Sequence, residues 1–353
     1  MGANLLIVFA TVALQSSPQD SATTSITHGF GFERLTDLFL YNRVQGLSFG
    51  LGYRVALPGT QPLRVYGTAR YGVSDERITG RITLRRDGRG GGVALSGYSD
   101  IADLDPFSAG RSFANTFNGL FAGHDNADYA LVRGGSATLE GSVGRSLALV
   151  VTARIERQSS VRQVAQSELN NFLGGTGLFP PNPPVDGGTF GAASVRLSHA
   201  GPTRWNLTVD GLGGSGQTTG RLFGDLRQGF GSGLGITLRL KAGAATVPSP
   251  PQSLFRLGGV HTVRGFEYGT RRAATFWAAQ VDFSPFEGRV RPVVFADAGQ
   301  AAGLSNLFSS AALVGGGVGV SLFGGLMRFD LSRPISPDQK GKVRFDLVIR
   351  GVR

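Results

Sequence analysis

The sequence of 353 residues contains no cysteine, only four histidines and no long uninterrupted apolar run. Without cysteine the chain cannot have a disulfide scaffold, a catalytic thiol or a Cys-ligated zinc site. The longest apolar segment, Leu5 to Leu14, is shorter than the roughly 20 residues that a transmembrane helix requires. Charged residues amount to 17% of the chain, too few for a disordered acidic or basic tail protein.

Residues that could carry out catalysis or bind metal are scattered. The histidines form no pair at the spacing of metal ligands; they are His28, His124, His199 and His261. No Gly-x-Ser-x-Gly element connects a strand to a helix, as many hydrolases require. We therefore expect no catalytic residue, no metal and no cofactor, and we expect that the chain is not an enzyme. An envelope enzyme is the least supported alternative.

Basic residues exceed acidic ones, with 35 Lys and Arg against 24 Asp and Glu and a formal net charge of +11. Such an excess suits nucleic acid, an anionic membrane surface or an anion-lined pore. The arginines are spread along alternating positions and do not form one basic patch, so we expect no nucleic-acid partner. We expect the arginines to line the interior of a pore, where they would attract anions, or to face lipopolysaccharide phosphates.

What the sequence does contain is 55 glycines and a long series of alternating segments. After residue 46, apolar residues occupy every second position, with polar residues or arginine between them, as in Leu47 to Leu57 and Val343 to Ile349. A period of two gives each strand one apolar and one polar face. The apolar faces turn inward in a soluble sandwich and outward to lipid in a membrane barrel, so the period leaves both open.

Three features favour the membrane barrel. The segments run for 9 to 13 residues, whereas strands of soluble proteins average about 5 to 6. Their joints are rich in turn residues, with almost no helical signal, and their polar faces are rich in arginine and glycine. We therefore predict an all-β, transmembrane antiparallel β-barrel over residues 37–353, with about 16 strands and a long loop folded into the lumen. Barrels of about 14 or 12 strands are the alternatives.

The N-terminus has the apolar core of an export signal. Leu5 to Leu14 is followed by the small polar stretch Gln15 to Ser17, although no positive residue precedes the apolar core. We predict that residues 1–17 are a truncated signal peptide and that residues 18–36 form a short periplasmic segment. A buried N-terminal strand or helix is the alternative.

Three stretches interrupt the alternation. Residues 101–127 carry four apolar side chains at helical spacing, namely Phe113, Phe117, Leu120 and Phe121. Residues 157–187 contain the run Pro180-Pro181-Asn182-Pro183-Pro184, which cannot pair within a sheet. Residues 246–272 begin with another proline-rich run. We expect all three to be long connections between strands.

The third connection contains a recognisable motif, Leu257-Gly258-Gly259 followed by Val263-Arg264-Gly265-Phe266. It resembles the inserted-loop motif of the BamA/TamA superfamily of outer-membrane assembly barrels, also called the bacterial surface antigen family. Phe295-Ala296-Asp297-Ala298-Gly299 resembles the Phe-x-Asp-x-Gly strand of that family, and residues 315–335 resemble its glycine-rich hairpin. The resemblance is specific from about residue 254 to the end of the chain and looser before it.

The resemblance implies an anchored loop. It implies that Arg264 grips Asp297 and Phe295, and that Gly265 permits a tight backbone at the loop tip. Physical chemistry agrees, because a guanidinium group suits a bidentate contact with a carboxylate. The alternative is an ordinary surface arginine in a glycine-rich turn. Many family members also place a glutamate four residues before a proline on the next strand, where this chain has Val281 between Gln280 and Asp282.

The resemblance also implies a function. It places the chain in the bacterial outer membrane, as a member without periplasmic POTRA domains, because few residues precede the first expected strand. Its role would be insertion or translocation of polypeptide or lipid through a labile seam between the first and last strands. The implied partners are outer-membrane lipid and lipopolysaccharide, client outer-membrane polypeptides or a separate periplasmic protein. The alternative from another class is a passive, anion-preferring pore.

Overall fold

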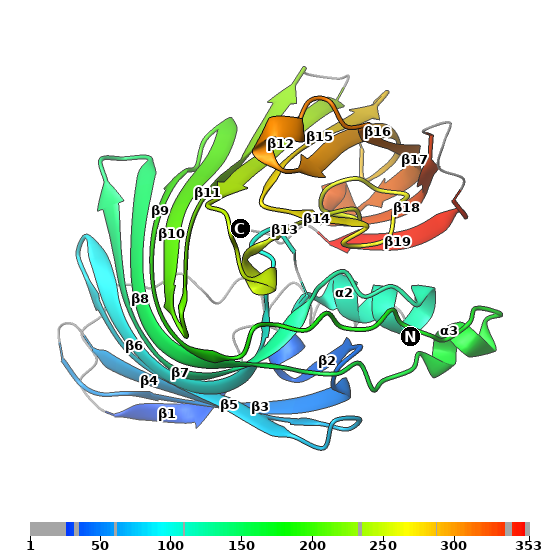
Figure 1. The fold of residues 1–353 in the computed structure, drawn as a ribbon. Coiled ribbons are helices and arrows are strands. Elements are labelled where there is room, and N and C mark those ends of the chain that lie inside the picture. The colour runs from blue at the N-terminus through cyan, green and yellow to red at the C-terminus, as the bar shows by residue number, and fades with distance from the viewer. Residues whose placement is uncertain are drawn as a thin grey trace.

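In the computed structural model, the described residues are 26–31, 35–59, 62–108, 110–231, 235–286, 288–335 and 341–349. The expected signal peptide, residues 1–17, lies outside them. One antiparallel sheet of 17 strands curves around a lumen and forms the barrel wall (Figure 1). Within it, the sixteen strands β2 to β12 and β15 to β19 pair in succession. The predicted all-β transmembrane antiparallel barrel of about 16 strands is therefore confirmed.

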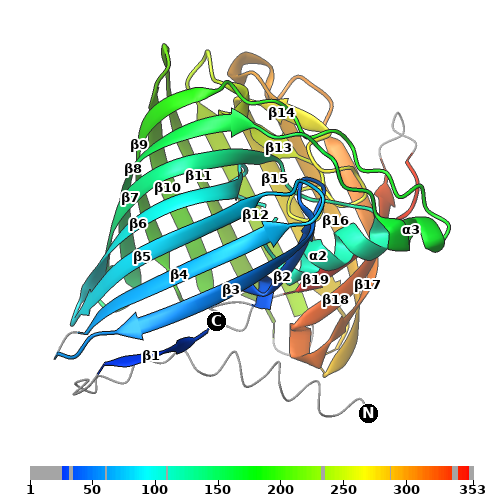
Figure 2. The same ribbon diagram turned by 90° about the horizontal axis from the view of Figure 1, so that it is seen from below.

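The strands of this sheet are β1 (Thr27–Phe30), β2 (Phe39–Asn42), β3 (Gly46–Ala56), β4 (Leu63–Gly72), β5 (Ile78–Gly88), β6 (Gly91–Asp103), β7 (Tyr129–Val143), β8 (Leu147–Ser160), β9 (Gly188–His199), β10 (Thr203–Gly214), β11 (Gln217–Phe230), β12 (Gly235–Ala245), β15 (Thr275–Ser284), β16 (Val290–Ala302), β17 (Leu313–Leu322), β18 (Met327–Pro334) and β19 (Arg344–Ile349). Most are tilted and long, and they run side by side along the wall (Figure 2).

The two faces of the wall have the polarity of a membrane barrel. On β3, Phe49 and Leu51 are 54% and 56% exposed on the outside, whereas Ser48, which precedes Phe49 and points to the opposite face, is fully buried inside. The same arrangement recurs on β5, where Ile78 and Ile82 are exposed and Thr79 is buried. Apolar residues therefore face outward to lipid and polar residues face the lumen, the reverse of a soluble sandwich.

The strand β1 lies within the segment that we expected to be periplasmic. It pairs with the second half of β3, from Thr27 opposite Ala56 to Phe30 opposite Tyr53. The short strand β2 pairs with the first half of β3, from Phe39 opposite Phe49 to Asn42 opposite Gly46. Both strands thus lie on one edge of β3, separated by the 3-10 turn η1 (Leu35–Asp37).

The three long connections lie at the same end of the barrel as the β2–β3 turn. Successive strands are antiparallel, and an even number of strands separates that turn from each connection. The first contains α2 (Phe113–Phe117) and the π-helical turn η2 (Asn118–Ala122), at the expected helical segment. The second contains α3 (Glu168–Phe172). The remaining elements are η3 (Pro251–Ser253), β13 (Phe255–Leu257), β14 (Arg271–Ala273), η4 (Leu304–Asn306) and η5 (Phe323–Gly325).

Side-chain caps start both short helices. The Ser112 hydroxyl accepts a hydrogen bond from the backbone N of Asn115 at the start of α2, and Ser167 does the same for Asn170 at the start of α3. No described helix combines the length and the apolar character that a membrane crossing would require.

Candidate functional site: the lumen loop and the barrel seam

The loop between β12 and β15 folds into the lumen and packs against the inner wall. Its base is the small hairpin of β13 and β14. Val263 and Phe266 at its tip are buried in one apolar cluster with wall residues of β11, β15 and β17. Gly258 and Gly259, the first half of the motif, both have positive φ angles, and Gly259 donates a backbone hydrogen bond to Phe266 O at 3.0 Å. The two halves of the motif therefore lie against each other.

Arg264 contacts both residues that the motif singled out on β16. Its Nε and Nη2 lie 2.7 and 2.5 Å from the two carboxylate oxygens of Asp297, and its backbone N donates to Asp297 at 2.9 Å. The guanidinium carbon lies 3.7 Å from the centre of the Phe295 ring. Burial by itself would lower the pKa of Arg264, but the Asp297 carboxylate outweighs burial and raises it. The arginine is therefore held in its charged form.

The carboxylate of Asp297 is one of three around Arg264. Nη2 of Arg264 also lies 2.9 Å from Asp282 Oδ1, and Nη1 lies 3.5 Å from Asp330 Oδ2. A second guanidinium, that of Arg328, bridges Asp282 at 2.8 Å and Asp330 at 2.6 Å. This cluster of two arginines and three aspartates connects the loop to β15, β16 and β18. Because every charge has a buried partner, removing one member leaves another uncompensated.

Arg328 and Asp330 were not expected from the sequence motifs. Both belong to the alternating segment MRFDLSRP, in which they occupy the same face as Ser332. Two opposite charges at positions i and i+2 on a lumen face were the available signal. The contact from β15 comes from Asp282, next to Val281, because alternation turns Val281 outward and Asp282 inward.

Two glycines permit the close approach of the loop to the wall. Gly265 has a φ of +91°, and a Cβ there would overlap the backbone of Arg333 on β18. A Cβ at Gly315 of β17 would overlap the carbonyl oxygen of Arg264. Larger residues at either position would push the loop away from Asp297.

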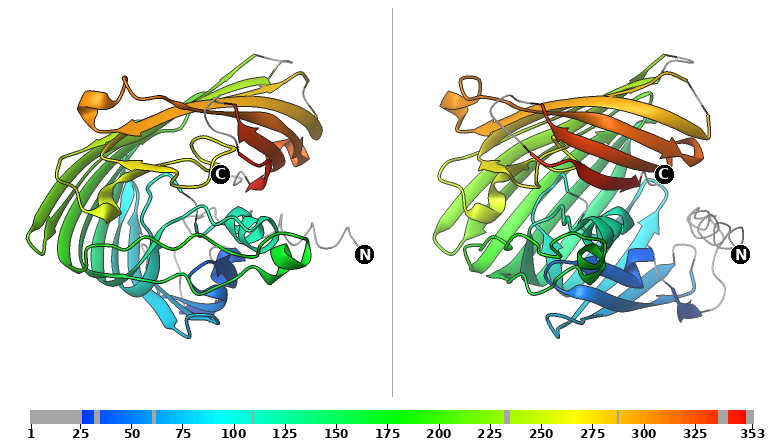
Figure 3. Two further views of the ribbon diagram at one scale, coloured as in Figure 1. Left: turned by 45° about the vertical axis from the view of Figure 1, so that its right-hand side comes forward. Right: turned by 90° about the vertical axis from the view of Figure 1, so that its right-hand side faces the viewer.

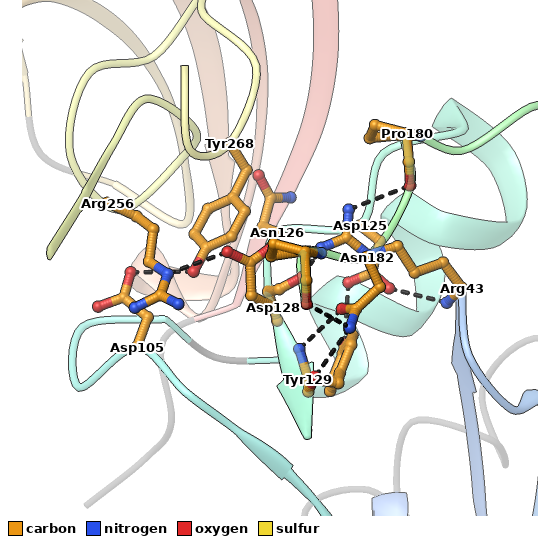
Figure 4. Close-up of polar contacts among 12 residues, drawn as sticks. Arg43, Asp105, Asp125, Asn126, Asp128, Tyr129, Pro180, Asn182, Arg256 and Tyr268 are labelled. Atoms are coloured by element: carbon orange, nitrogen blue, oxygen red, sulfur yellow. Dashed lines mark hydrogen bonds and ion pairs between the residues drawn. The ribbon is translucent and has the colours of Figure 1, made fainter. Parts of the chain in front are cut away.

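A second buried charge cluster, centred on Asp128, joins the connections at the end of the barrel (Figure 4). One oxygen of Asp128 lies 2.5 Å from Arg43 Nη2, in the β2–β3 turn. The other lies 2.9 Å from Arg256 Nε on β13 and 3.4 Å from Arg272 Nη2 on β14. Burial alone would raise the pKa of Asp128, but the guanidinium groups of Arg256, Arg43 and Arg272 outweigh it and lower the pKa.

Neighbouring side chains bind the remaining connections to this cluster. Asp125 accepts hydrogen bonds from the backbone N of Arg43 at 2.8 Å and from Asn115 Nδ2 of α2 at 2.8 Å. Asn182, in the proline-rich connection, binds both backbone groups of Tyr129 at 2.8 Å (Figure 4). The three long connections and the β2–β3 turn thus form one lid. These contacts were not expected from the sequence, because contacts between loops leave no periodic signal.

The first and last strands of the succession, β2 and β19, flank the segment α2–η2. α2 and η2 each contact both strands. In the right-hand view of Figure 3, the teal and green helices lie between the blue N-terminal strands and the red C-terminal strands. We call this region, where α2–η2 lies between β2 and β19, the seam.

Side chains of α2–η2 bind the backbone of both seam strands. Thr116 Oγ1 accepts a hydrogen bond from the backbone N of Tyr41 on β2 at 3.2 Å. Asn118 Nδ2 donates to the carbonyl oxygen of Leu347 on β19 at 2.9 Å, and Asn118 Oδ1 accepts from Leu347 N at 2.6 Å. A primary amide presents one acceptor and two donors, so Asn118 makes the pair of bonds that an adjacent antiparallel strand residue would make.

Aromatic contacts support the same arrangement. Phe113 of α2 packs edge-on against Phe39 of β2, with ring centres 6.1 Å apart. Phe117 packs against Phe329 of β18 at 6.3 Å on the other side. The next connection covers η2 from outside, where Asn170 Nδ2 of α3 donates to Phe121 O at 3.1 Å.

Histidines and acidic residues form no metal site here. His261 is in the lumen loop, where its backbone oxygen accepts a hydrogen bond from Lys241 at 2.6 Å. His124 lies 3.6 Å from Asp346 of β19. Across the part of the chain that the structure describes, no three His, Asp or Glu residues gather as a metal would require.

These features define a transmembrane antiparallel β-barrel with a loop anchored in its lumen and a helical segment between its terminal strands. Residues 17–193 match the family described as "Family of unknown function (DUF5686) C-terminal domain". The match extends over half of the chain, and the chain belongs to this family. No curated protein matches the sequence.

A solved structure shows the same fold. The barrel is similar to that of BamA from Haemophilus ducreyi lacking POTRA domains 1–3, with 12% identity and a TM-score of 0.59, over 98% of this chain and 77% of that one. CdiB from Acinetobacter baumannii is 12% identical, with a TM-score of 0.47, over 91% of this chain and 58% of that one. The BamA likeness extends to almost the whole chain and concerns the fold alone.

Proposed function

We propose that this chain is a bacterial outer-membrane barrel of the BamA/TamA kind that inserts or translocates polypeptide through the seam between β2 and β19. The observation that carries the proposal is the hydrogen bonding of Leu347. Both of its backbone groups are bound by the Asn118 side chain, and Tyr41 N is bound by Thr116. Side chains of a connecting segment therefore occupy strand edges that an extended polypeptide could pair with.

The seam contacts are few by comparison with the wall. Each hydrogen bond contributes a net of about 0.5–1.5 kcal/mol, so the three side-chain bonds contribute about 1.5–4.5 kcal/mol. By contrast, β7 and β8 are paired continuously from Ala130 opposite Ser160 to Val143 opposite Leu147. In hydrogen bonds alone, displacing α2–η2 from the two strands thus costs much less than separating two wall strands.

The anchored loop has a complementary role in this proposal. Arg264 connects the loop to β15, β16 and β18, which precede β19 in the wall. A firmly held C-terminal half would present the edge of β19 in a fixed position while α2–η2 moves. Arg264, Gly265, Phe266, Phe295 and Asp297 would then act as positioning residues, and no catalytic residue is needed.

The outer face and the fold support the proposed location and partners. The apolar belt of β3 and β5 suits contact with outer-membrane lipid, and basic residues suit lipopolysaccharide phosphates. The proposed clients are outer-membrane polypeptides with an extended strand, delivered directly or by a separate periplasmic protein.

An engineered disulfide bond across the seam tests the proposal. Because the chain lacks cysteine, Asn118→Cys combined with Leu347→Cys introduces a unique pair. The oxidised pair should stop the chain from restoring client barrels in a deletion strain, and reduction should restore them. Each single substitution is the matched control for loss of the native side chain. Full client levels with a demonstrably oxidised pair would rule out passage through the seam.

A passive, anion-preferring pore is the second candidate, and it is favoured by the arginines on the lumen face. Steady anion-selective conductance in planar bilayers, together with client barrels unaffected by the deletion, would support it. Conductance that changes on deleting residues 254–272 would show that the lumen loop controls the path.

A further inference from the structure

A row of arginines lies on the inner wall at the end of the barrel opposite the long connections. Arg204 of β10 is directly opposite Arg227 of β11, and Arg227 is directly opposite Arg239 of β12. Leu207 on β10, Leu222 on β11 and Leu240 on β12 belong to the opposite face of the same strands and are exposed outside. Alternation therefore turns the three guanidinium groups to the lumen.

This arrangement is electrostatically unfavourable without a counter-charge. Arginine stays protonated at every accessible pH, and like charges directly opposite each other destabilise a sheet. Neighbouring strands lie about 4.8 Å apart, so the row is roughly 10 Å long. Asp282 attracts Arg227, whereas a fourth guanidinium, that of Arg291 on β16, repels it.

The nearby carboxylates of Asp282 and Asp225 also have partners outside the row. Asp282 lies 2.9 Å from Arg264 and 2.8 Å from Arg328, whereas Arg239 is 4.0 Å away from it. Asp225 accepts a hydrogen bond from Asn206.

The arginines themselves have unused donors. Within the described ranges, Arg204 and Arg227 form no ion pair. The Nε atoms of Arg239 and Arg291 are buried without a hydrogen-bond partner. Among the described residues, these four cations thus have one ion pair, that of Arg239 with Asp282 at 4.0 Å, and Asp282 is shared with Arg264 and Arg328.

We propose that Arg204, Arg227 and Arg239, with Arg291 beside them, bind an anion that carries more than one phosphate group. Guanidinium groups form paired hydrogen bonds with phosphate oxygens, and several in a row match several charged groups on one ligand. The site lies near the ends of β10, β11 and β12 that are opposite the long connections. It does not depend on whether polypeptide passes through the seam.

Pyrophosphate binding to the full-length chain in zwitterionic detergent tests the proposal. Calorimetry should show binding that weakens as salt is raised. Combining Arg204→Gln with Arg227→Gln should weaken binding by at least about tenfold. The control combines Arg64→Gln with Arg154→Gln, which removes two lumen charges that are paired with Asp87 and Glu156. Absence of binding, or equal weakening by both double variants, would overturn the site.

Thermal unfolding separates a ligand site from a structural role. Without anion, the Arg204→Gln and Arg227→Gln double variant should unfold at the same or a higher temperature than the parent chain, because a repulsion is removed. Pyrophosphate should raise the unfolding temperature of the parent chain alone. A double variant that unfolds at a lower temperature without anion would show that the row is structural and would contradict the proposal.

Vesicles identify the source of the phosphate. The chain is reconstituted in phosphatidylcholine vesicles with or without phosphatidylglycerol, and pyrophosphate binding is measured again. If phosphatidylglycerol weakens pyrophosphate binding, and does so only when Arg204 and Arg227 are present, the site is supported with a lipid headgroup as its ligand. Unchanged pyrophosphate binding supports it with a free anion as ligand. Competition that persists in the double variant would place the anion on another surface and refute the assignment.

Discussion

The side chain of Asn118 pairs with Leu347 as a strand residue would, giving one hydrogen bond to its carbonyl oxygen and taking one from its N–H. The two residues are 229 positions apart in the chain. Both are buried, with 1% exposure each. The edge of the last strand is therefore covered at this point by a side chain from the connection between β6 and β7.

Asn118→Ala should weaken the seam. The substitution leaves both buried backbone groups of Leu347 without partners, at about 1–3 kcal/mol for each group. Amide hydrogen exchange at Leu347 should accelerate by at least tenfold, while exchange in β7 and β8 stays unchanged. Asn206→Ala, which removes a lumen amide far from the seam, is the control. Unaltered exchange at Leu347 in Asn118→Ala would show that other contacts hold the edge.

Arg264→Ala should release the lumen loop. It removes the guanidinium from three buried carboxylates, which costs about 3–5 kcal/mol when one partner of a buried pair is deleted. We expect lower heat stability of the folded barrel on gels, and protease cleavage within residues 258–270. Arg264→Lys keeps the charge but loses the bidentate geometry, and it should give an intermediate result. Unchanged heat-modifiability and stability in Arg264→Ala would disprove the anchoring role.

Gly315→Ala should displace the loop without changing any charge. The added methyl group would overlap the Arg264 carbonyl oxygen, so the loop must move away from β17. Overpacking of this kind costs roughly 1–3 kcal/mol. Gly229→Ala on the lumen face of β11 is the control, because a Cβ there meets no atom within 4 Å. If the two variants have equal unfolding temperatures, the close approach at Gly315 is not needed.

The Asp128 cluster should make the lid sensitive to acid. The pKa of Asp128 is lowered in the folded chain, so its stabilising effect is fully present above the unfolded value of about 3.9. This effect is lost as the pH falls through the lower folded pKa. Protease protection of residues 104–128 should therefore stay constant from about pH 7 to pH 5 and decline only below about pH 4.

Asp128→Asn is the matched variant for this pH experiment. It removes the titrating group and leaves Arg43 and Arg256 buried without their carboxylate, so lid protection should be weaker at neutral pH and should lose its acid transition. An acid transition that persists unchanged in Asp128→Asn would assign it to another carboxylate, such as Asp125.

The sequence by itself determined the wall. Alternation over 9 to 13 residues fixes which side chains of a strand share a face, because successive residues in a strand point in opposite directions. Alternation puts Phe295 and Asp297 on one face and Val294 on the other, and in the structure Phe295 and Asp297 are buried inside while Val294 is exposed outside. The number of strands followed from counting such segments, and the resemblance of the Val263 to Phe266 motif indicated which loop enters the lumen.

Only the tertiary structure decided what meets inside that wall. The partners Asp128, Arg43 and Arg256 lie in connections, where no periodicity records their direction, and they are brought together by the curvature of the whole sheet. The pairing of Asn118 with Leu347 likewise requires the last strand of the barrel, β19, to come near the α2–η2 segment, which also contacts the first strand, β2. The alternation of residues along a strand determines the face on which each side chain lies. Contacts between distant residues depend instead on the register between strands and on the closure of the barrel, and many strands together determine both.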